Sequence, residues 1–359
     1  MLRADAPLVL LQHGGLDNLS GKTGLAMLRY REGPIVAVID PAYAGADLGK
    51  LTGIERNVPV VADMAEALAF GPAVAVVGLA PSGGRLPLEM RSDVVAALRA
   101  GLSLASGLHS RLAVDPEFAA VPLATGQWIW DLRHEPPDLE VATARCAALP
   151  CRRLLAVGSD MAVGKMSACL ELQRAAQRAG LDARFVGTGQ AGILISGQGV
   201  ALDAVRVDYA AGAVEAAVLA AAAGADAESW VLVEGQGSLA HPGSTATLPL
   251  MRGSQPTDLL LVHRAGQRHV RTRPGAVAVE IPPLPELIAA CEALAALGRP
   301  DGQRPLVRAI ALNTALLDAD AAAREAEAIA ASTGLPVIDP VRQGPARLLE
   351  ALLQTPASR

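Results

Sequence analysis

The 359-residue chain is poor in aromatic residues, in cysteine and above all in lysine. Phe, Trp and Tyr make up 3% of it, so alanine-rich helices must supply much of the core packing. The four cysteines include no Cys-x-x-Cys pair, which predicts a reduced, cytoplasmic protein. The net charge of −5 argues against nucleic acid as a partner, because duplex binding needs a basic face.

Long apolar runs are also missing. No basic-then-apolar leader opens the chain and no uninterrupted apolar run could cross a bilayer, so no membrane partner is expected. What the chain does have is length and apolar content: 51% of its residues are hydrophobic, enough for two domains that each bury a core. Its alanine-rich helices are compatible with a homo-oligomer.

The scarcity of lysine points to a specific feature. Of 31 basic residues only Lys22, Lys50 and Lys165 are lysines, and all three follow glycine. Gly-Lys is the signature of phosphate-binding loops, where a compact ammonium fits and a guanidinium fork does not. Base composition and chance are the alternative explanation.

The first half alternates short apolar runs with helical periodicity. Strands are predicted at 7–12, 34–40 and 73–80, and helices at 22–30, 63–70 and 92–101. This alternation predicts an open parallel sheet covered on both faces, a Rossmann-like domain over residues 1–148. Residues 127–151, with two tryptophans and a Pro-Pro, are interpreted as the junction between domains.

The alternation resumes after the junction and predicts a second doubly wound α/β domain over residues 149–359. Its predicted strands are 153–157, 183–187, 230–234, 258–263, 307–313 and 336–339. Its predicted helices are 165–179, 209–224, 285–297, 318–332 and 343–353.

The sequence GSDMAVGKMS, residues 158–167, lies between a predicted strand and a predicted helix. Glycines let the backbone wrap an anion, the helix start offers free N–H groups, and lysine completes the site. The residues expected to bind a phosphate-bearing cofactor are Gly158, Ser159, Asp160, Val163, Gly164, Lys165, Met166 and Ser167. Five residues separate the two glycines instead of the standard four, so the loop is a variant.

A second loop, GLDNLSGKTG at 15–24, has the same skeleton and contains Gly21, Lys22 and Thr23. It is a possible second anion site, but it is longer and lacks a supporting acid strand, and the alternative is a structural loop with a solvent-facing lysine. Asp40 ends the next strand, where dinucleotide-binding folds place a ribose-binding acid, although no G-x-G-x-x-G loop accompanies it.

The second domain resembles the dethiobiotin synthetase branch of the P-loop proteins. The resemblance rests on G-x-D-x-x-V-G-K, on WVLVEG ending in Glu234, on ALN ending in Asn313 and on TGLPV at 333–337. It implies that Glu234 lies beside the phosphates and that Asn313 reads adenine. One position departs from the pattern. Met166 stands where Ser or Thr normally ligates Mg²⁺, and a thioether is a poor ligand for so hard an ion.

Several segments without a phosphate-loop explanation, among them 79–91, 100–117, 130–133 and 187–215, extend the resemblance to nearly the whole chain. Together they resemble a bacterial and archaeal family catalogued as a domain of unknown function, which couples a Rossmann-like domain to a P-loop domain. Some of its members are described as D-glutamate N-acetyltransferases that use acetyl-CoA. The resemblance implies an acetyl-CoA-dependent N-acetyltransferase acting on a small acidic amino acid.

Such a reaction needs a base for the ammonium, N–H donors for the oxyanion and cations for the substrate carboxylates. The base candidates are Glu234, His241 and Asp208; glycine-rich 187–192 and 234–238 are the candidate donors. The candidate substrate ligands are Gln190, Arg206, Arg252 and Arg264, with His109 as a further cleft residue. Each has a structural alternative: Glu234 holds Lys165, His241 sits in a turn, or Asp208 caps a helix.

Two other functions are open. An ATP- and Mg-dependent ligase or kinase of the dethiobiotin synthetase type would use the same loop, although Met166 counts against it. A nucleotide sensor or a metallochaperone GTPase is the third; NTAL at 313–316 lacks the Lys and Asp that guanine recognition usually requires. No metal-binding residues are predicted.

Overall fold

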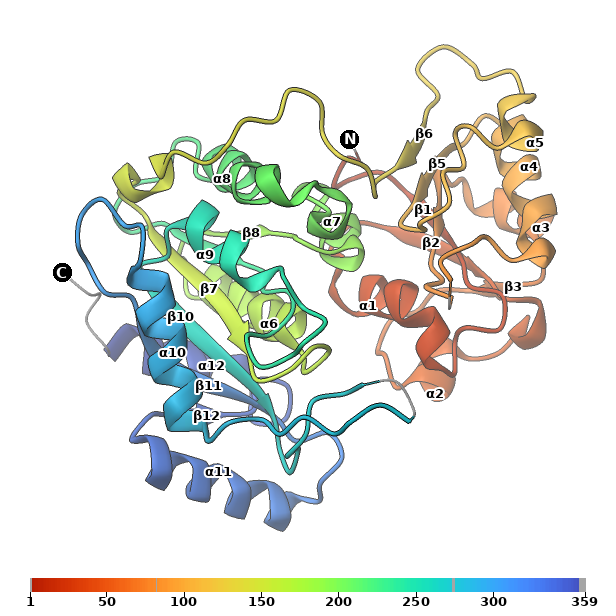
Figure 1. Ribbon diagram of the computed structural model, residues 1–359. Coiled ribbons are helices and arrows are strands. Elements are labelled where there is room, and N and C mark those ends of the chain that lie inside the picture. Colours follow the sequence, from red (N-terminus) through yellow and green to blue (C-terminus); the bar gives the residue numbers. More distant parts are fainter. Residues whose placement is uncertain (1, 82, 273–274, 355–359) are drawn as a thin grey trace. The chain divides into compact units, whose positions relative to one another are not determined.

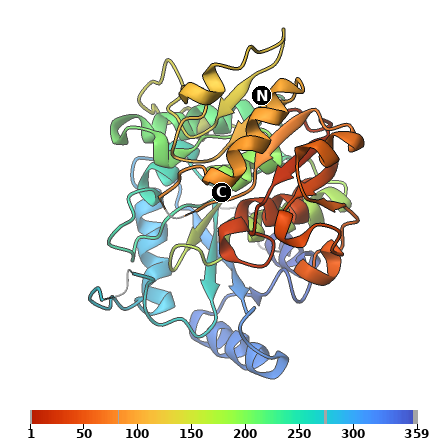
Figure 2. The ribbon, with the colours of Figure 1, turned by 90° about the vertical axis from the view of Figure 1, so that its right-hand side faces the viewer.

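The computed structural model describes residues 2–81, 83–272 and 275–354, and the chain divides into two compact units (Figures 1 and 2). Unit 1 comprises the chain up to Glu135 together with Gln190–Ala204. Unit 2 comprises Pro136–Gly189 and the chain from Val205 onward. Each unit is built on one parallel sheet of six strands.

The sheet of unit 1 has the order β3-β2-β1-β4-β5-β6, and all its neighbouring strands are parallel. The strands are β1 (Leu8–Leu11), β2 (Ile35–Ile39), β3 (Val60–Val61), β4 (Val74–Val77), β5 (Ser103–Ser106) and β6 (Ile129–Asp131). The helices between them are α1 (Lys22–Tyr30), α2 (Leu48–Thr52), α3 (Met64–Ala67), α4 (Arg91–Arg99) and α5 (Pro116–Ala119). This is the Rossmann strand order, which reverses direction between β1 and β4.

Right-handed crossovers place α1 and α2 on one face of this sheet and α3, α4 and α5 on the other. The second face carries a continuous apolar core in which Met64, Met90 and Phe118 are fully buried. The strands are short apolar runs buried on both faces, as parallel sheets require.

The sheet of unit 2 has the order β12-β11-β10-β7-β9-β8, again parallel throughout. The strands are β7 (Arg152–Gly158), β8 (Ala183–Val186), β9 (Trp230–Val233), β10 (Asp258–Arg264), β11 (Leu306–Asn313) and β12 (Val337–Ile338). The helices of this unit are α6 (Lys165–Arg178), α8 (Ala210–Ala221), α9 (Thr247–Ser254), α10 (Leu284–Ala296), α11 (Ala319–Thr333) and α12 (Pro345–Gln354). In Figure 1, α6 and α12 pack together, while α8, α9 and α10 form a separate layer.

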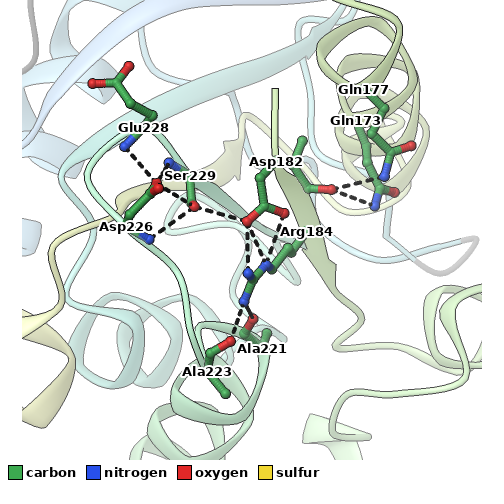
Figure 3. Close-up of polar contacts among 10 residues, drawn as sticks. Gln173, Gln177, Asp182, Arg184, Ala221, Ala223, Asp226, Glu228 and Ser229 are labelled. Atoms are coloured by element: carbon green, nitrogen blue, oxygen red, sulfur yellow. Dashed lines mark hydrogen bonds and ion pairs between the residues drawn. The ribbon is translucent and has the colours of Figure 1, made fainter. Parts of the chain in front are cut away.

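The amino ends of β8 and β9 are joined by a polar network (Figure 3). The Arg184 guanidinium forms an ion pair with Asp182 at 2.7 Å and donates to the carbonyl oxygens of Ala221 and Ala223, at the end of α8. Ser229 Oγ donates to Asp182 at 2.9 Å. Because the strands are parallel, this network lies at the end of the sheet opposite to the loop after β7.

The predicted fold class, two doubly wound parallel α/β domains, is confirmed. All nine predicted strands occur, and α1 has the predicted bounds. Four helices, α2, α5, α7 and α9, and three short strands, β3, β5 and β6, were not predicted from the sequence. Residues 127–151 are not only a junction, since β6 lies within them.

The compact units also differ from the expected division at residue 148. Residues 136–148 belong to unit 2 because Glu215 of α8, fully buried, accepts hydrogen bonds from the N–H and Nε of Arg145 at 2.7 and 2.9 Å. It accepts a third, from the N–H of Thr143 at 3.3 Å. The chain therefore passes from one compact unit to the other at three places, after Glu135, after Gly189 and after Ala204.

The segment Gln190–Ala204, which contains α7 (Gln190–Ser196), belongs to unit 1 although unit 2 flanks it in sequence. The buried guanidinium of Arg31 donates to the carbonyl oxygens of Leu194 and Ile195 at 3.2 and 3.3 Å, at the carboxyl end of α7. Burial lowers the pKa of Arg31. The chain therefore passes from unit 2 to unit 1 after Gly189 and returns at Val205.

None of the helices in the described parts of the chain is both long and apolar enough to span a membrane.

Candidate nucleotide-binding site

The loop 158–165 connects the carboxyl end of β7, the central strand of unit 2, to the first residue of α6. Two residues turn it through left-handed conformations, Ala162 with φ of +56° and Gly164 with φ of +114°. Gly164 immediately precedes the 14-residue helix α6, whose first N–H groups have no partner within the helix. The loop therefore connects a strand to a helix start through a tight turn, which is the arrangement that an anion site requires.

Lys165 is buried within this loop, only 6% exposed, and its Nζ donates to the main-chain oxygen of Asp160 at 2.8 Å. Two glycines make room for its side chain. A Cβ on Gly158 would lie 2.8 Å from Nζ, and a Cβ on Gly235 would meet the Ala156 oxygen at 1.7 Å and Lys165 Cδ at 2.9 Å. Burial lowers the pKa of Lys165 to about 8, which Asp160 and Glu234 partly offset. The ammonium keeps donors for a ligand anion, since it has three and one is used.

The carboxylate of Asp160 is buried and points toward protein donors. Its Oδ1 accepts from the N–H of Met161 at 2.6 Å, and its Oδ2 accepts from Gln267 Nε2 and from the N–H of Arg271 at 2.6 and 2.7 Å. It therefore ties the segment after β10 to the phosphate loop. Ser159 is equally committed: its hydroxyl pairs with Nδ1 of His263 at 2.8 Å.

Asn313 and Arg264 support the loop from the neighbouring strand ends. Asn313 Nδ2 donates to the carbonyl oxygen of Val163 at 2.9 Å, and its Oδ1 accepts from the N–H of Ala315 at 3.1 Å. Arg264 Nη2 donates to the carbonyl oxygen of Ala162 at 2.6 Å. Both side chains lie beside the loop, and the N–H groups described here donate to carbonyl oxygens of the loop itself. Their predicted roles toward adenine and carboxylates stay predictions.

Glu234 follows β9 and is 7% exposed. Its Oε2 accepts hydrogen bonds from the N–H groups of Thr188 and Gly189 at 2.8 and 3.2 Å. Burial raises the pKa of Glu234 to about 7, although these two N–H groups and Lys165 act in the opposite direction. Lys165 and Glu234 interact electrostatically, and burial moves the pKa of each toward neutrality from opposite sides.

The other two base candidates are placed differently. His241 Nδ1 accepts from the N–H of Gly243 at 3.0 Å, so the proton is on Nε2, which donates to the carbonyl oxygen of Arg271 at 2.8 Å. Both ring nitrogens are used, as the turn interpretation requires. Asp208 is exposed within a 3-10 turn, and α8 has no side-chain cap, so the expected capping role is wrong.

Of the predicted substrate ligands Arg264 lies beside the loop, and the others lie on other elements. Arg252 is exposed on α9, and the exposed Arg206 stacks on the ring of Tyr209 at 4.6 Å. Gln190 belongs to unit 1, where its Nε2 donates to Thr23 Oγ1 at 3.0 Å. His109 is also in unit 1 and pairs with Arg133.

The amino-terminal loop 15–24 is closed by its own backbone and by the side chains of Gln12 and Gln190. Gln12, fully buried, donates from Nε2 to the carbonyl oxygen of Gly21 at 3.0 Å, and a Cβ on Gly21 would lie 1.9 Å from the Gly15 oxygen. Thr23 is 1% exposed and its hydroxyl accepts a hydrogen bond from Gln190, while Lys22 is exposed. This geometry favours the structural interpretation of the loop.

Sequence reasoning missed several residues that shape the site. Thr188 and Gly189 were expected to donate to an oxyanion, but their N–H groups hold Glu234. Gln267 and His263 were not anticipated. His263 lies near the carboxyl end of β10 and Gln267 lies three residues beyond it, and this position is the one signal that indicates them. Gln236 Nε2 donates to the Thr188 oxygen at 2.6 Å and completes the connection between β8 and β9.

Comparisons with known proteins agree with this architecture. Residues 140–349 match the family described as a domain of unknown function, DUF1611 C-terminal P-loop domain, and residues 41–135 match its N-terminal Rossmann-like domain. A DUF1611 family protein of Anabaena variabilis has a crystal structure with a TM-score of 0.88 and 50% identity, covering 98% of this chain and 100% of that one.

Two curated relatives carry a functional name. A protein of Tritonibacter scottomollicae named D-glutamate N-acetyltransferase is 35% identical over 349 residues, 97% of this chain and 98% of the relative. A Pseudoalteromonas protein of the same name is 35% identical over 280 residues, 78% of this chain and 81% of the relative.

Proposed function

The chain belongs to the DUF1611 family, and on that basis we propose that it transfers an acetyl group from acetyl-CoA to the amino group of a small acidic amino acid. Two relatives named D-glutamate N-acetyltransferase support this reaction class, one of them matched over nearly its full length. D-Glutamate is accordingly the first substrate to test.

The observation that carries the proposal is the composition of the phosphate loop. The buried ammonium of Lys165, the cradle left by Gly158 and Gly235 and the start of α6 suit a diphosphate. Met166 occupies the position at which metal-dependent P-loop enzymes carry a Mg²⁺-ligating hydroxyl. Coenzyme A carries a diphosphate that can be bound without a catalytic metal, whereas phosphoryl transfer from ATP requires one.

The residues that would hold the CoA diphosphate are Lys165 and the main-chain N–H groups at the start of α6. When bound, acetyl-CoA supplies the activated acetyl thioester. The protein must then hold the diphosphate, keep a proton acceptor near neutrality and remove a proton from the substrate ammonium.

Glu234 is the base candidate whose properties suit that proton transfer. With a pKa raised to about 7 by burial, it is about half ionised at neutral pH and can both accept and release a proton. The N–H groups of Thr188 and Gly189 fix one carboxylate oxygen, which leaves Oε1 to face a reactant. His241, with both nitrogens bonded, and the exposed Asp208 are less suitable.

The test is calorimetric titration of the full chain with acetyl-CoA, CoA, and ATP with and without Mg²⁺, followed by an assay of thiol release with D-glutamate. Acetyl-CoA is expected to bind without a metal. Lys165→Ala should weaken binding about 10- to 100-fold, because a charge-assisted contact to a buried phosphate is lost. Lys22→Ala is the matched control and should bind as the unaltered protein does.

Two results would contradict the proposal. If acetyl-CoA binds no better than ATP, and ATP requires Mg²⁺, the ligase or kinase alternative replaces it. If Lys22→Ala and Lys165→Ala lose equal affinity for acetyl-CoA, the amino-terminal loop is an anion site as well, and the assignment of the diphosphate to the loop after β7 alone fails.

A further inference from the structure

Two arginines lie beside the phosphate loop of unit 2, and the proposed function does not use either of them. Arg264 is the last residue of β10, and Arg271 lies in the segment that follows this strand. β10 pairs with β7, the strand that leads into the phosphate loop, and Val262 lies opposite Gly158. Ligands of open α/β sheets bind outside the carboxyl ends of the strands, which is the edge where both arginines lie.

The Arg264 side chain is half-buried and is held by the phosphate loop itself. Its Nη2 donates to the carbonyl oxygen of Ala162 at 2.6 Å. Its Nε is buried and has no hydrogen-bond acceptor among the described residues. A guanidinium has more N–H donors than this one contact uses, so its Nη groups still have donors for an anion. The contact with Ala162 therefore fixes the guanidinium at the edge of the loop without saturating it.

Arg271 is fixed through its main chain. Its N–H donates to Asp160 Oδ2 at 2.7 Å, and its carbonyl oxygen accepts from His241 Nε2 at 2.8 Å. Its side chain is exposed and forms no hydrogen bond with the described residues. Because Asp160 and Ala162 are close neighbours in the loop, both arginines are anchored to the same short stretch of backbone.

The two guanidinium groups lie close enough to repel each other. Burial lowers the pKa of Arg264, and the positive charge of Arg271 lowers it further. Asp160 acts in the opposite direction, but its carboxylate oxygens already accept hydrogen bonds from uncharged donors. A second carboxylate near this segment, Glu325, accepts from the N–H of Gly266 at 3.2 Å. No ion pair joins either arginine to a carboxylate of the described residues, so an anionic ligand would relieve the repulsion.

The position of the two arginines indicates the kind of anion. The proposed function places the diphosphate of acetyl-CoA at Lys165, and Arg264 contacts the same loop at Ala162. An anion bound by the arginines must therefore lie a short distance from the diphosphate. In coenzyme A, only the ribose separates the 5′-linked diphosphate from a phosphate on the 3′-oxygen. A phosphomonoester carries close to two negative charges at neutral pH, which the two guanidinium groups match.

We propose that Arg264 and Arg271 form a second phosphate subsite in unit 2, which binds the 3′-phosphate of coenzyme A. Guanidinium groups bind phosphate oxygens strongly because several of their N–H donors lie in one plane. The inference rests on the proposed function, since it takes acetyl-CoA as the ligand of the loop. It assigns Arg264 to the cofactor in place of the substrate carboxylates. It also predicts a preference for coenzyme A over ATP, which carries no 3′-phosphate.

The experiment is calorimetric titration of the full chain with coenzyme A and with 3′-dephospho-coenzyme A, which differ only in this phosphate. The unaltered protein should bind the dephospho form about 10- to 100-fold more weakly, because charge-assisted hydrogen bonds are lost. The difference should decrease as salt is added, since the Arg271 side chain is exposed to solvent. This comparison needs no variant and so does not depend on the folding of one.

Variants then assign the difference to residues. Arg271→Gln removes a charge but retains the main-chain hydrogen bonds of this residue, so it should weaken coenzyme A binding about tenfold and leave dephospho-coenzyme A binding unchanged. Arg264→Gln should also reduce the affinity ratio of the two coenzymes, although loss of the bond to Ala162 weakens both. Arg178→Gln is the matched control, since this exposed arginine ends α6 far from the loop, and it should keep the ratio of the unaltered protein.

Equal affinity of the unaltered protein for the two coenzymes overturns the inference and leaves the proposed function standing. A preference for coenzyme A that persists in both Arg264→Gln and Arg271→Gln overturns it as well, because other residues then bind the 3′-phosphate. Binding of neither coenzyme refutes the proposed function, and this inference with it. A ratio that falls in either of the two variants but not in Arg178→Gln supports the subsite.

Discussion

Gly158 and Lys165 are in such close contact that a Cβ on the glycine would lie 2.8 Å from the lysine Nζ. The glycine ends β7 and the lysine begins α6, so this contact closes the phosphate loop on itself. The bare α-carbon of Gly158 is therefore what allows the ammonium to remain buried beneath the loop.

Gly158→Ala tests this contact. The atom that the new methyl group meets first is the end of a flexible side chain, so we expect the protein to fold and Lys165 to be displaced. Acetyl-CoA affinity should fall about tenfold, corresponding to about 1.4 kcal/mol, with little change in melting temperature. Gly49→Ala, whose Cβ would lie 3.3 Å from its nearest atom, Asp47 Oδ1, is the control. Wild-type affinity in Gly158→Ala would show that the lysine position is unimportant.

The pKa values at the loop predict a bell-shaped pH profile for acetyl transfer. The rate should rise with pH as Glu234 ionises through a pKa of about 7, and acetyl-CoA binding should weaken as Lys165 loses its charge above about 8. Glu234→Gln should remove the acidic limb together with most of the activity while retaining acetyl-CoA binding. A Glu234→Gln enzyme with an unchanged pH profile would assign the base elsewhere.

Stability should depend on pH through the same residue. The pKa of Glu234 rises from 4.5 to about 7 on folding, so between these values the folded chain binds more protons than the unfolded chain. The free energy of unfolding should therefore fall as pH increases through this window, and Glu234→Gln should flatten that dependence. Urea denaturation of both proteins at pH 5 and pH 7 measures the difference. An identical slope in the variant would contradict the buried, protonatable carboxyl.

Met166→Thr should change the ligand preference of the loop. The substitution restores a hydroxyl at the position where P-loop enzymes ligate Mg²⁺, so ATP should bind about tenfold more tightly in the presence of Mg²⁺ than in its absence. The unaltered protein, with a thioether there, should show no such metal dependence. Titration with ATP at fixed Mg²⁺ checks both. Failure of Met166→Thr to gain metal dependence would show that other residues exclude the ion.

Glu215→Ala should destabilise unit 2. This fully buried carboxylate holds Arg145 and Thr143, and its loss leaves their N–H groups without an acceptor. We expect the free energy of unfolding to fall by about 3 kcal/mol. Glu228→Ala, at an exposed carboxylate of the same unit, should change it by less than about 0.5 kcal/mol. Urea denaturation followed by circular dichroism compares them, and equal stability would mean that Glu215 does not anchor residues 136–148.

The helices and strands that were predicted correctly are those with a clear hydrophobic periodicity. Strands such as β1 and β7 are apolar runs buried on both faces, and α6 begins at the expected lysine. Short elements escaped it: β3 has two residues and β6 has three, too few for any period to show. The strand within the predicted junction thus went unrecognised because its residues, Ile129–Asp131, form no extended apolar run.

Individual side chains were less predictable than elements. Glu234 lies beside Lys165 as the resemblance implied, but the donors that hold it come from Thr188 and Gly189, 46 and 45 residues away along the chain. The two Gly-Lys loops have similar sequences. Only the packing of Gln12 and Gln190 against loop 15–24 distinguishes that loop from the loop after β7.

The sequence by itself determined the two parallel sheets, the loop after β7 and the absence of a magnesium-ligating hydroxyl at Met166, since all three depend on residues adjacent or periodic along the chain. Only the tertiary structure decided which polar groups are satisfied. His241 has both nitrogens bonded, whereas His13 Nδ1 and Asp40 Oδ2 have no donor among the described residues. Hydrogen-bond satisfaction depends on groups that parallel strands bring together from distant parts of the chain, and no local pattern records it.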